Sequence, residues 1–427
     1  MIEEAITSLV VNSKYSELGE EIVTEVKRRV LDAAGVALAS LNSPPAGVMK
    51  RMREEFDGNA PIIGGGTASP DFSSFYNTLL IRYLDFNDTY LSREPLHPSD
   101  MIGPIYSIAK LKKSSVRDLI LAIAVGYEIG TRLCDAASLR SLGFDHVNFL
   151  GIAASAALSK LLHMDEKKTL NAISIATVPN VALRETRVGE LSMWKAGAAA
   201  DAARNAAFAA LAASKGFTAP AKPFSGKYGF ANLICRDVLN FDERGIEKMQ
   251  GILKTHIKKY PVEYHAQSVA EMGIQIANEV RGREIRRIVI ETYEAGKSIL
   301  ADDEKWHPKN RETADHSLPF IASASIATGD MWLETYKLIG NRKITELIKK
   351  VEVVEREDYT AAYPRKLPTC IIVETDKGTV SREMEIPSGH AMHPLTQEEI
   401  EAKFMRLTGK RRLMEKLREL KEVPLIA

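Results

Sequence analysis

The chain has 427 residues, of which 45% are hydrophobic and 26% are charged, and its formal net charge is +1. This composition is typical of a globular protein with more than one domain and a large core. The charge balance leaves no basic excess to neutralise phosphates, which argues against a nucleic-acid or membrane-surface role.

The cysteines and the apolar runs exclude further classes. Cys134, Cys235 and Cys370 are far apart and form no CxxC pair, so neither a disulfide framework nor a recognisable zinc or iron–sulfur site is expected. The first residues start acidic and lack a basic segment followed by an apolar run, so no signal peptide is expected. Without an apolar run of about eighteen residues, no membrane span is expected either. We therefore expect a cytoplasmic protein.

The first part of the chain is predicted to be all α, with no convincing strand. Apolar residues recur at helical spacing within 20–40, and 71–84 is apolar on most sides, as in a buried helix. Ser115 and Asp118 form a plausible capping box for the helix that follows. Further helices are predicted at 149–162, 169–178 and 194–214, and the last is so rich in Ala that close helix–helix contact is expected.

The pattern changes near residue 283. Short β-branched segments predict strands within 282–296 and 349–357, and a hairpin within 369–387 that turns at Asp376-Lys377-Gly378. Helices are predicted at 264–280, at 313–328 and, highly charged, from Thr396 to about Leu420.

These elements predict a multi-domain fold with a large all-α helical domain and a smaller α+β domain. The helical domain comprises 1–262 and 396–427, because the final helix resembles the first part in character. The α+β domain comprises 263–395 and is inserted between the two helical segments.

One segment between two apolar helices concentrates chemically active side chains. The sequence LDFNDTYLSREPLHPSD, residues 84–100, contains four carboxylates together with Thr89 and His97. Pro95 and Pro98 disfavour the α conformation of the residues before them, so the second half is predicted to be an ordered loop. Such a loop fixes a His and a carboxylate rigidly, and the alternative is a solvated acidic loop.

Four further clusters combine His, carboxylate or basic residues. They are Asp145-His146; Arg184, Arg187 and Lys195; Lys258, Lys259, Tyr260 and His265 around Pro261; and His307, Arg311, Asp315 and His316.

Each cluster has a functional and a structural interpretation. The bases of the second cluster crowd the start of the Ala-rich helix, where an anion is favoured, or form an exposed basic loop. The third lies at the expected domain junction, where small-molecule sites concentrate. His146 can be a satisfied structural group. In the last cluster, Thr313 or Asp315 can simply cap the helix that follows.

Together the clusters offer His and carboxylates for proton transfer and several cations for an anionic substrate. This metal-free set suits removal of a proton next to a carboxylate, as in dehydration, decarboxylation, epimerisation or isomerisation of polycarboxylic acids. The chain has no GxGxxG, Walker, GxSxG or HExxH motif, so nucleotide-binding, serine-hydrolase and zinc-protease interpretations have no support.

The same segments carry a family resemblance. They are LDFNDTYL with HPSD, GYEIGTRL, the DHV segment, LRETRVGELSMWKAGAAADAARNAAFAA, KKYPVEYHAQ, KWHPKNRETADHSLPF and PSGHAMHPL. In this order they resemble the MmgE/PrpD family, from about Val30 to about Leu407. The resemblance implies a helical domain completed by the C-terminal helix, a smaller α+β lid domain, an active site in the cleft between them, a homodimer, and no metal or organic cofactor.

The resemblance also implies site residues. Asp85, Thr89 and His97 match the pocket of the family's decarboxylase branch, and His146, Lys195 and Lys258 match its other pocket residues. Phe320 falls where the decarboxylase has a Tyr. The hypothesis is therefore that Asp85, His97, His146 and Lys258 are catalytic and that Thr89, Arg187, Lys195 and Phe320 bind the substrate, with no metal ligands.

Three differences bear on the reaction. The WKAGAAA and RETADHS segments resemble those of the dehydratase-like branch. Glu263 stands where the decarboxylase has its junction His, and Phe320 cannot donate a proton as a Tyr could. These differences favour a hydro-lyase that dehydrates a 2-methylcitrate-like tricarboxylic acid in propionate metabolism, although Met101 stands where dehydratases have Asn. The alternatives are a cis-aconitate decarboxylase or iminodisuccinate epimerase of the same family, or a non-catalytic anion-binding homologue.

The implied mechanism is general acid/base catalysis. Lys195, Lys258 and Arg187 would bind the substrate carboxylates. One of His97 and His146 would remove the proton next to a carboxylate while the other protonates the departing hydroxyl. Asp85 would orient His97, and Thr89 would hold a carboxylate or hydroxyl group. The sequence leaves open which His is the acid.

Overall fold

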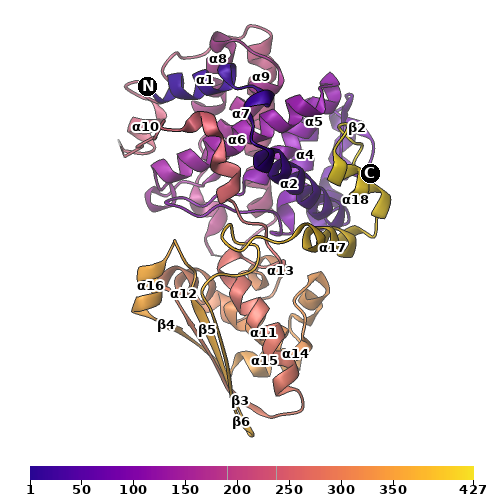
Figure 1. Ribbon diagram of the computed structural model, residues 1–427, viewed down its shortest axis with the longest axis vertical. Helices are drawn as coiled ribbons and strands as arrows, with labels where there is room; N and C mark the ends of the chain where they lie inside the picture. The colour runs from indigo at the N-terminus through magenta and orange to yellow at the C-terminus, as the bar shows by residue number, and fades with distance from the viewer. Residues whose placement is uncertain (190, 237) are drawn as a thin grey trace. The chain divides into compact units, whose positions relative to one another are not determined.

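A computed structural model describes residues 1–189, 191–236 and 238–427, and it divides into two compact units (Figure 1). Unit 1 comprises Met1–Val188, Met193–Thr255 and Thr396–Ala427. Unit 2 comprises His256–Leu395 and Gly189–Ser192, of which residue 190 is not described. The large helical part and the smaller α+β part agree with the predicted fold class, whereas the predicted domain limits at 262 and 395 stay a prediction.

Unit 1 is built almost entirely of helices. They are α1 (Ile2–Asn12), α2 (Glu20–Ala39), α3 (Pro44–Met52), α4 (Pro70–Tyr83), α5 (Ile102–Lys112), α6 (Val116–Ala136), α7 (Val147–Leu161), α8 (Glu166–Thr177), α9 (Trp194–Ser214), α10 (Phe230–Leu233), α17 (Gln397–Thr408) and α18 (Arg411–Glu419).

Helix α9 is the centre of this bundle. It packs against α4, α7 and α8, and its Ala side chains at positions such as 199, 203, 206 and 210 are buried. Because Ala is small, the neighbouring helix axes approach closely, as the sequence predicted. The predicted capping box of α6 is confirmed, since Ser115 Oγ accepts from the Asp118 amide at 3.1 Å and Asp118 Oδ2 accepts from the Ser115 amide at 3.1 Å.

The prediction that this part contains no strand is wrong at one place. Strands β1 (Ala60–Pro61) and β2 (Thr67–Ala68) form an antiparallel pair around the glycine run 64–66. Two-residue strands are too short to show an alternating hydrophobic pattern, so periodicity could not reveal them.

The C-terminal segment is two helices where the sequence predicted one. Helix α17 ends at Gly409, which has a φ of 66° in the left-handed region and so stops the helix before α18. Helix α17 packs on α2, and Lys403 Nζ lies 2.7 Å from Asp32 Oδ1. The same ammonium donates to the Phe86 carbonyl oxygen at 2.8 Å. Helix α17 therefore supports the loop that follows α4.

Unit 2 combines a sheet with helices. Its elements are α11 (Gln267–Val280), β3 (Ile285–Thr292), α12 (Glu294–Leu300), α13 (Arg311–Ala314), α14 (Leu318–Thr328), α15 (Arg342–Ile348), β4 (Val351–Glu355), α16 (Glu357–Ala362), β5 (Thr369–Thr375) and β6 (Gly378–Met384).

The strands form one sheet in the order β4-β3-β5-β6, with β3 parallel to β4 and the other pairs antiparallel (Figure 1). The predicted strands and the predicted hairpin are confirmed. Helices α11 and α14 contact the sheet, and Ile288, Ile290, Ile371 and Val373 are buried in the core that these elements share.

The predicted helix 313–328 is interrupted. Asn310 caps α13, and Ser317 caps α14 by accepting from the Phe320 amide at 3.1 Å. The capping role considered for Thr313 or Asp315 is therefore filled by Asn310 and Ser317, and Pro319 sits in the first turn of α14, where a proline is tolerated.

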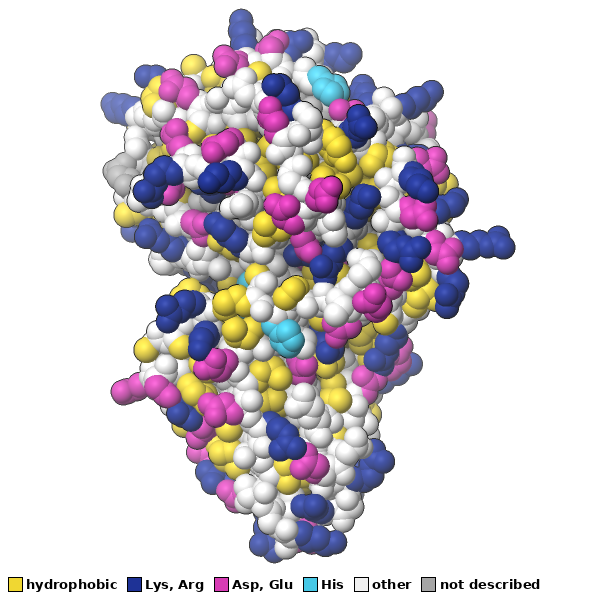
Figure 2. Space-filling model, viewed as in Figure 1, with side chains coloured by type: hydrophobic (Ala, Val, Ile, Leu, Met, Phe, Trp, Pro, Cys, Tyr) yellow, Lys and Arg dark blue, Asp and Glu magenta, His cyan; other side chains and the backbone are white. Residues whose placement is uncertain are grey.

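Cys134, Cys235 and Cys370 are buried and carry no disulfide. Among the residues that the structure describes, no helix is both long and apolar enough to cross a bilayer. On the face shown in Figure 2, Lys and Arg side chains are interspersed with Asp and Glu over most of the surface.

Candidate active site

The loop between α4 and α5 is ordered and buried. Its backbone forms a bridge between Tyr90 and Leu96 and then a 3₁₀ turn at Pro98–Met101. The predicted ordered loop is confirmed, and the alternative of a solvated acidic loop is wrong, because its acidic side chains and most of its other polar side chains are buried. They are Asp85, Asn87, Asp88, Thr89, Glu94, His97, Ser99 and Asp100.

Asp85 occupies a strained position at the start of this loop. Its φ of 50° lies in the left-handed region, which costs a non-glycine residue about 1–2 kcal/mol. Its carboxylate accepts from Arg82 Nη1 at 2.5 Å and lies 3.4 Å from Lys195 Nζ, at the start of α9. Backbone strain next to a buried ion cluster is typical of functional sites.

The imidazole of His97 is fixed through its Nδ1. This nitrogen lies 2.8 Å from the backbone carbonyl oxygen of Asp88, which can only accept a hydrogen bond. Nδ1 therefore carries the proton, and in the neutral ring the lone pair is on Nε2. His97 is consequently presented with Nε2 as its basic atom.

The sequence did not identify Asp88 as part of this arrangement. Its Oδ2 accepts from the Tyr127 hydroxyl at 2.7 Å, and its Oδ1 accepts from the Ser99 amide at 2.9 Å. Arg29 Nε lies 3.4 Å from Oδ2. These contacts hold the segment whose carbonyl orients His97. In the sequence, Asp88 was marked only by its place in the acidic loop. Its contact with Tyr127 could not be predicted, because Tyr127 lies on a separate helix, α6.

His146 lies at the start of α7 and is paired with its neighbour Asp145. Nδ1 of His146 is 3.1 Å from Asp145 Oδ1. The other carboxylate oxygen accepts from Arg187 Nε at 2.9 Å, and Arg187 Nη1 donates to the Lys195 carbonyl oxygen at 2.8 Å. The sequence predicted Arg187 as a substrate ligand. Its guanidinium is engaged with Asp145, so the geometry supports a positioning role, and substrate binding by Arg187 stays a prediction.

The charge states of this pair follow from burial and from the neighbouring cations. Burial lowers the pKa of His146 to about 3, with Arg187 and Arg82 acting in the same direction. Burial alone would raise the pKa of Asp145, but Arg187 and His146 outweigh it and lower it to about 2. At neutral pH Asp145 is therefore ionised and His146 is neutral. The proton on Nδ1 faces Asp145, and Nε2 carries the lone pair.

The two imidazoles face each other edge to face, with ring centroids 5.8 Å apart and an interplanar angle of 62°. His146 Nε2 is buried and has no hydrogen-bond partner among the described residues. His97 and His146, each with its Nδ1 held by a neighbouring oxygen, therefore belong to the same unit as Arg82 and Lys195, whose cations both lie close to Asp85. This arrangement can move protons on an anionic molecule.

Two other buried groups belong to the same loop. Thr89 Oγ1 donates to the Leu96 carbonyl oxygen at 3.2 Å, and its predicted contact with substrate stays a prediction. Burial raises the pKa of Asp100 to about 8, against the opposing effect of Arg82. Its Oδ1 accepts from Asn87 Nδ2 at 2.9 Å, and the Arg82 guanidinium lies 3.8 Å from Oδ2.

Unit 1 thus brings together six of the predicted site residues, namely Asp85, Thr89, His97, His146, Arg187 and Lys195. Lys258 and Phe320 belong to unit 2. Lys258 is 1% exposed, and its catalytic role stays a prediction. Phe320 is part of the hydrophobic core of unit 2 and stacks on Tyr336 with centroids 5.9 Å apart, packing that gives its predicted substrate contact no support.

Taken within each unit, the described residues contain no group of three or more His, Cys, Asp or Glu side chains close enough to share a metal ion.

Comparison with known proteins places these residues in a family context. Residues 4–241 match the MmgE/PrpD N-terminal domain, and residues 260–423 match the MmgE/PrpD C-terminal domain.

Several curated relatives align with most of the chain. A probable 2-methylcitrate dehydratase of Saccharomyces cerevisiae is 28% identical over 73% of this chain and 66% of its own length. A mitochondrial 2-methylcitrate dehydratase of Yarrowia lipolytica is 29% identical over 73% and 64%, and a 2-methylcitrate dehydratase of Escherichia coli is 26% identical over 75% and 71%. The chain thus spans less than two thirds of the length of the two yeast relatives.

Proposed function

This chain belongs to the MmgE/PrpD family, and we propose that it is a metal-independent hydro-lyase that dehydrates a 2-methylcitrate-like tricarboxylic acid by general acid/base catalysis. The observation that carries the proposal is the pair of fixed imidazoles, His97 and His146, with ring centroids 5.8 Å apart, in the unit that also holds the Lys195 ammonium 3.4 Å from Asp85. The 2-methylcitrate dehydratases among its relatives support the choice of substrate.

His146 is the proposed base. It is neutral at physiological pH, and Asp145 lies against its Nδ1 and stabilises the imidazolium formed when Nε2 accepts a proton. The proton taken is the one next to a substrate carboxylate. Arg187 is proposed to position His146 indirectly, by holding Asp145 in place.

His97 is the proposed acid. When protonated, it donates from Nε2 to the departing hydroxyl, while its Nδ1 proton stays on the Asp88 carbonyl oxygen. The electrons of the broken C–H bond form the new double bond, the C–O bond breaks, and water leaves. The proton gained by His146 then returns to His97 through solvent, which restores both rings.

Lys195 is the proposed ligand of a substrate carboxylate. Its ammonium lies 3.4 Å from Asp85, longer than a strong charged hydrogen bond, so a carboxylate can compete for it. Positive charge at this place stabilises the negative charge that builds up on the substrate as its proton is removed. Thr89 is proposed as a further ligand of a carboxylate or hydroxyl group.

Purified protein tested against 2-methylcitrate, citrate, cis-aconitate and iminodisuccinate in the presence of a chelator checks this proposal. We expect the absorbance of a new conjugated double bond and a product lighter by one water, formed from 2-methylcitrate in preference to citrate. Release of carbon dioxide from cis-aconitate or epimerisation of iminodisuccinate would replace the dehydratase proposal. Loss of activity with chelator would contradict metal independence.

We also propose that the chain forms a homodimer through the segment that precedes and begins α9. Large hydrophobic side chains gather there on the outside of unit 1: Val178, Val181, Leu183, Val188, Met193 and Trp194 are all at least 40% exposed. Such a concentration of exposed apolar groups favours a partner surface. Sedimentation equilibrium tests this, and a monomer at micromolar concentration would contradict it. A cytoplasmic location is a further proposal, tested by imaging the tagged protein in its cell of origin.

A further inference from the structure

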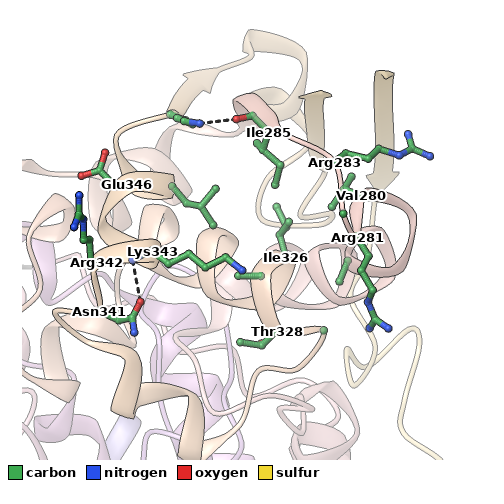
Figure 3. Close-up of a pocket in the computed structure, with 16 residues that line it drawn as sticks. Val280, Arg281, Arg283, Ile285, Ile326, Thr328, Asn341, Arg342, Lys343 and Glu346 are labelled. Atoms are coloured by element: carbon green, nitrogen blue, oxygen red, sulfur yellow. Dashed lines mark hydrogen bonds between the residues drawn. The ribbon is translucent and has the colours of Figure 1, made fainter. Parts of the chain in front are cut away.

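Unit 2 contains a cavity of about 760 Å³ that is separate from the residues of the proposed active site. It lies where the ends of α11 and α14 meet the beginnings of β3 and α15 (Figure 3). All of its lining residues belong to unit 2. Its volume is within the range of natural small-molecule sites.

The charges around this cavity are strongly unbalanced. The basic residues that line it are Arg281, Arg283, Arg342, Lys343 and Lys350, whereas its one acidic residue is Glu346. In the part of the chain that the structure describes, none of these five cations forms an ion pair with a carboxylate. Glu346 is paired with Lys349 at 2.9 Å, and Lys349 does not line the cavity.

This imbalance differs from most of the face shown in Figure 2, where charges of both signs are mixed. On the sheet of the same unit, for example, Arg287 pairs with Glu352 and with Glu374. Apart from Glu346, the lining offers these cations no carboxylate, so a bound anion would gain favourable electrostatic interactions with them.

The interior of the cavity is partly apolar. Val280, Ile285 and Ile326 line it, and in Figure 3 the side chain of Lys343 extends across it toward Ile326. Lys350 Nζ donates to the Ile285 carbonyl oxygen at 2.7 Å, which holds this cation at the wall. Asn341 Oδ1 accepts from the Lys343 amide at 2.9 Å, so the Asn341 side-chain nitrogen remains as a donor.

We propose that this cavity is a binding site for a small organic anion that carries two or more carboxylate or phosphate groups on a short apolar frame. Arg and Lys at the rim would bind the charged groups, and Val280, Ile285 and Ile326 would contact the frame. Since none of the lining residues belongs to the proposed active site, the ligand would bind apart from the substrate, and this proposal is independent of the proposed reaction.

Isothermal titration of the full chain with two probes tests the site. Pyrophosphate represents phosphate groups, and tricarballylate represents carboxylate groups. The variant is Lys343→Glu, which places an acidic residue in the first turn of α15, where the helix dipole favours it, so folding is preserved. The matched control is Lys337→Glu, because Lys337 is exposed in the same unit and does not line the cavity. Lys195→Ala removes the proposed carboxylate ligand of the active site.

At least one probe should bind saturably to the wild type, to Lys337→Glu and to Lys195→Ala. Lys343→Glu should weaken this binding about tenfold or more, and added Arg283→Glu should weaken it further. High salt should also weaken it. Tighter binding of pyrophosphate indicates a phosphate ester, and tighter binding of tricarballylate indicates a polycarboxylate. Absence of saturable binding at millimolar probe, or equal binding by Lys343→Glu and Lys337→Glu, would overturn the proposal.

Discussion

Arg187 donates from Nε to Asp145 Oδ2 at 2.9 Å, and the other oxygen of that carboxylate lies 3.1 Å from Nδ1 of His146. The guanidinium, the carboxylate and the imidazole thus form a chain that ends at Nε2 of His146, which has no hydrogen-bond partner among the residues that the structure describes. Arg187 is forty-two positions away from Asp145 in the sequence. Its contribution to the reaction should therefore be a matter of orientation.

Replacement of Arg187 by Ala should lower kcat by about 10–100-fold, the usual effect of losing a group that orients a functional side chain. KM should change little, because the guanidinium is engaged with Asp145. Steady-state kinetics of Arg187→Ala measures both constants, and Arg184→Ala is the control, since Arg184 donates to the Arg140 carbonyl oxygen instead. A large increase in KM with unchanged kcat would instead assign Arg187 to substrate binding.

Replacement of either imidazole by an amide should lower kcat by about 10²–10⁴-fold, the cost of losing a general acid or base. His97→Gln and His146→Gln are the test variants. His163→Asn is the control, because His163 is an exposed residue at a left-handed position that Asn tolerates.

The pH dependence gives a separate test of the base. Because burial lowers the pKa of His146 to about 3, the ring stays in its basic form at pH 5. The kcat/KM profile of the wild type should therefore show no acid limb near pH 6.5 that belongs to His146. An acid limb near that pH that disappears in a partly active His146 variant would contradict the assignment.

Asp100 should make the fold less stable as the pH rises. Its pKa is raised by burial from an ordinary value of 3.8 to about 8, so the folded state keeps the proton that the unfolded state loses. The stability that the protonated form provides is complete below about pH 4 and is lost as the pH rises toward 8.

Asp100→Asn should remove this dependence. The variant should be more stable than the wild type at pH 8, by about 1 kcal/mol or more, and the advantage should shrink at pH 5. Thermal unfolding at both pH values measures it, with the exposed Asp303→Asn as control. If the stability of Asp100→Asn relative to the wild type were lower at pH 8 than at pH 5, Asp100 would not be protonated in the folded protein.

Tyr127→Phe should destabilise the protein by about 1–3 kcal/mol, because Asp88 then loses one donor in a buried site. Activity should fall as well, since the Asp88 backbone orients His97. Urea unfolding and kcat measure the two effects. Tyr76→Phe is the control: the Tyr76 hydroxyl is buried and has no hydrogen-bond partner in the described part of the chain, so its removal should cost little. Equal losses of stability and kcat in Tyr127→Phe and Tyr76→Phe would show that the Tyr127 hydroxyl does not help to position His97.

The sequence predicted the elements that repeat a pattern over several turns or residues. The Ala run of α9, the capping box at Ser115 and the β-branched strands of unit 2 all lie where local pattern indicates. Strands β1 and β2 are too short to show a hydrophobic period. The charged helical pattern of the C-terminal segment did not reveal that Gly409 divides it into two helices.

For the site, local pattern indicated the loop and the basic cluster before α9, but it did not indicate which side chains contact each other in the fold. Tyr127 is thirty-nine positions from Asp88, and Lys195 is one hundred and ten positions from Asp85. Pairings over such separations depend on how the helices pack, which a single sequence does not specify. Arg187 was consequently expected at the substrate, whereas its contacts lead to Asp145.

The support that Lys403 gives to the Phe86 carbonyl oxygen has a consequence for the order in which the protein matures. Synthesis runs from the N-terminus, so all of unit 2 leaves the ribosome before α17 does. The ion pair between Asp32 and Lys403 can therefore form only when nearly the whole chain has been synthesised. The loop between α4 and α5 is therefore completed last, and a nascent chain that stalls before residue 403 would carry most of the proposed site residues without the lysine that supports their loop.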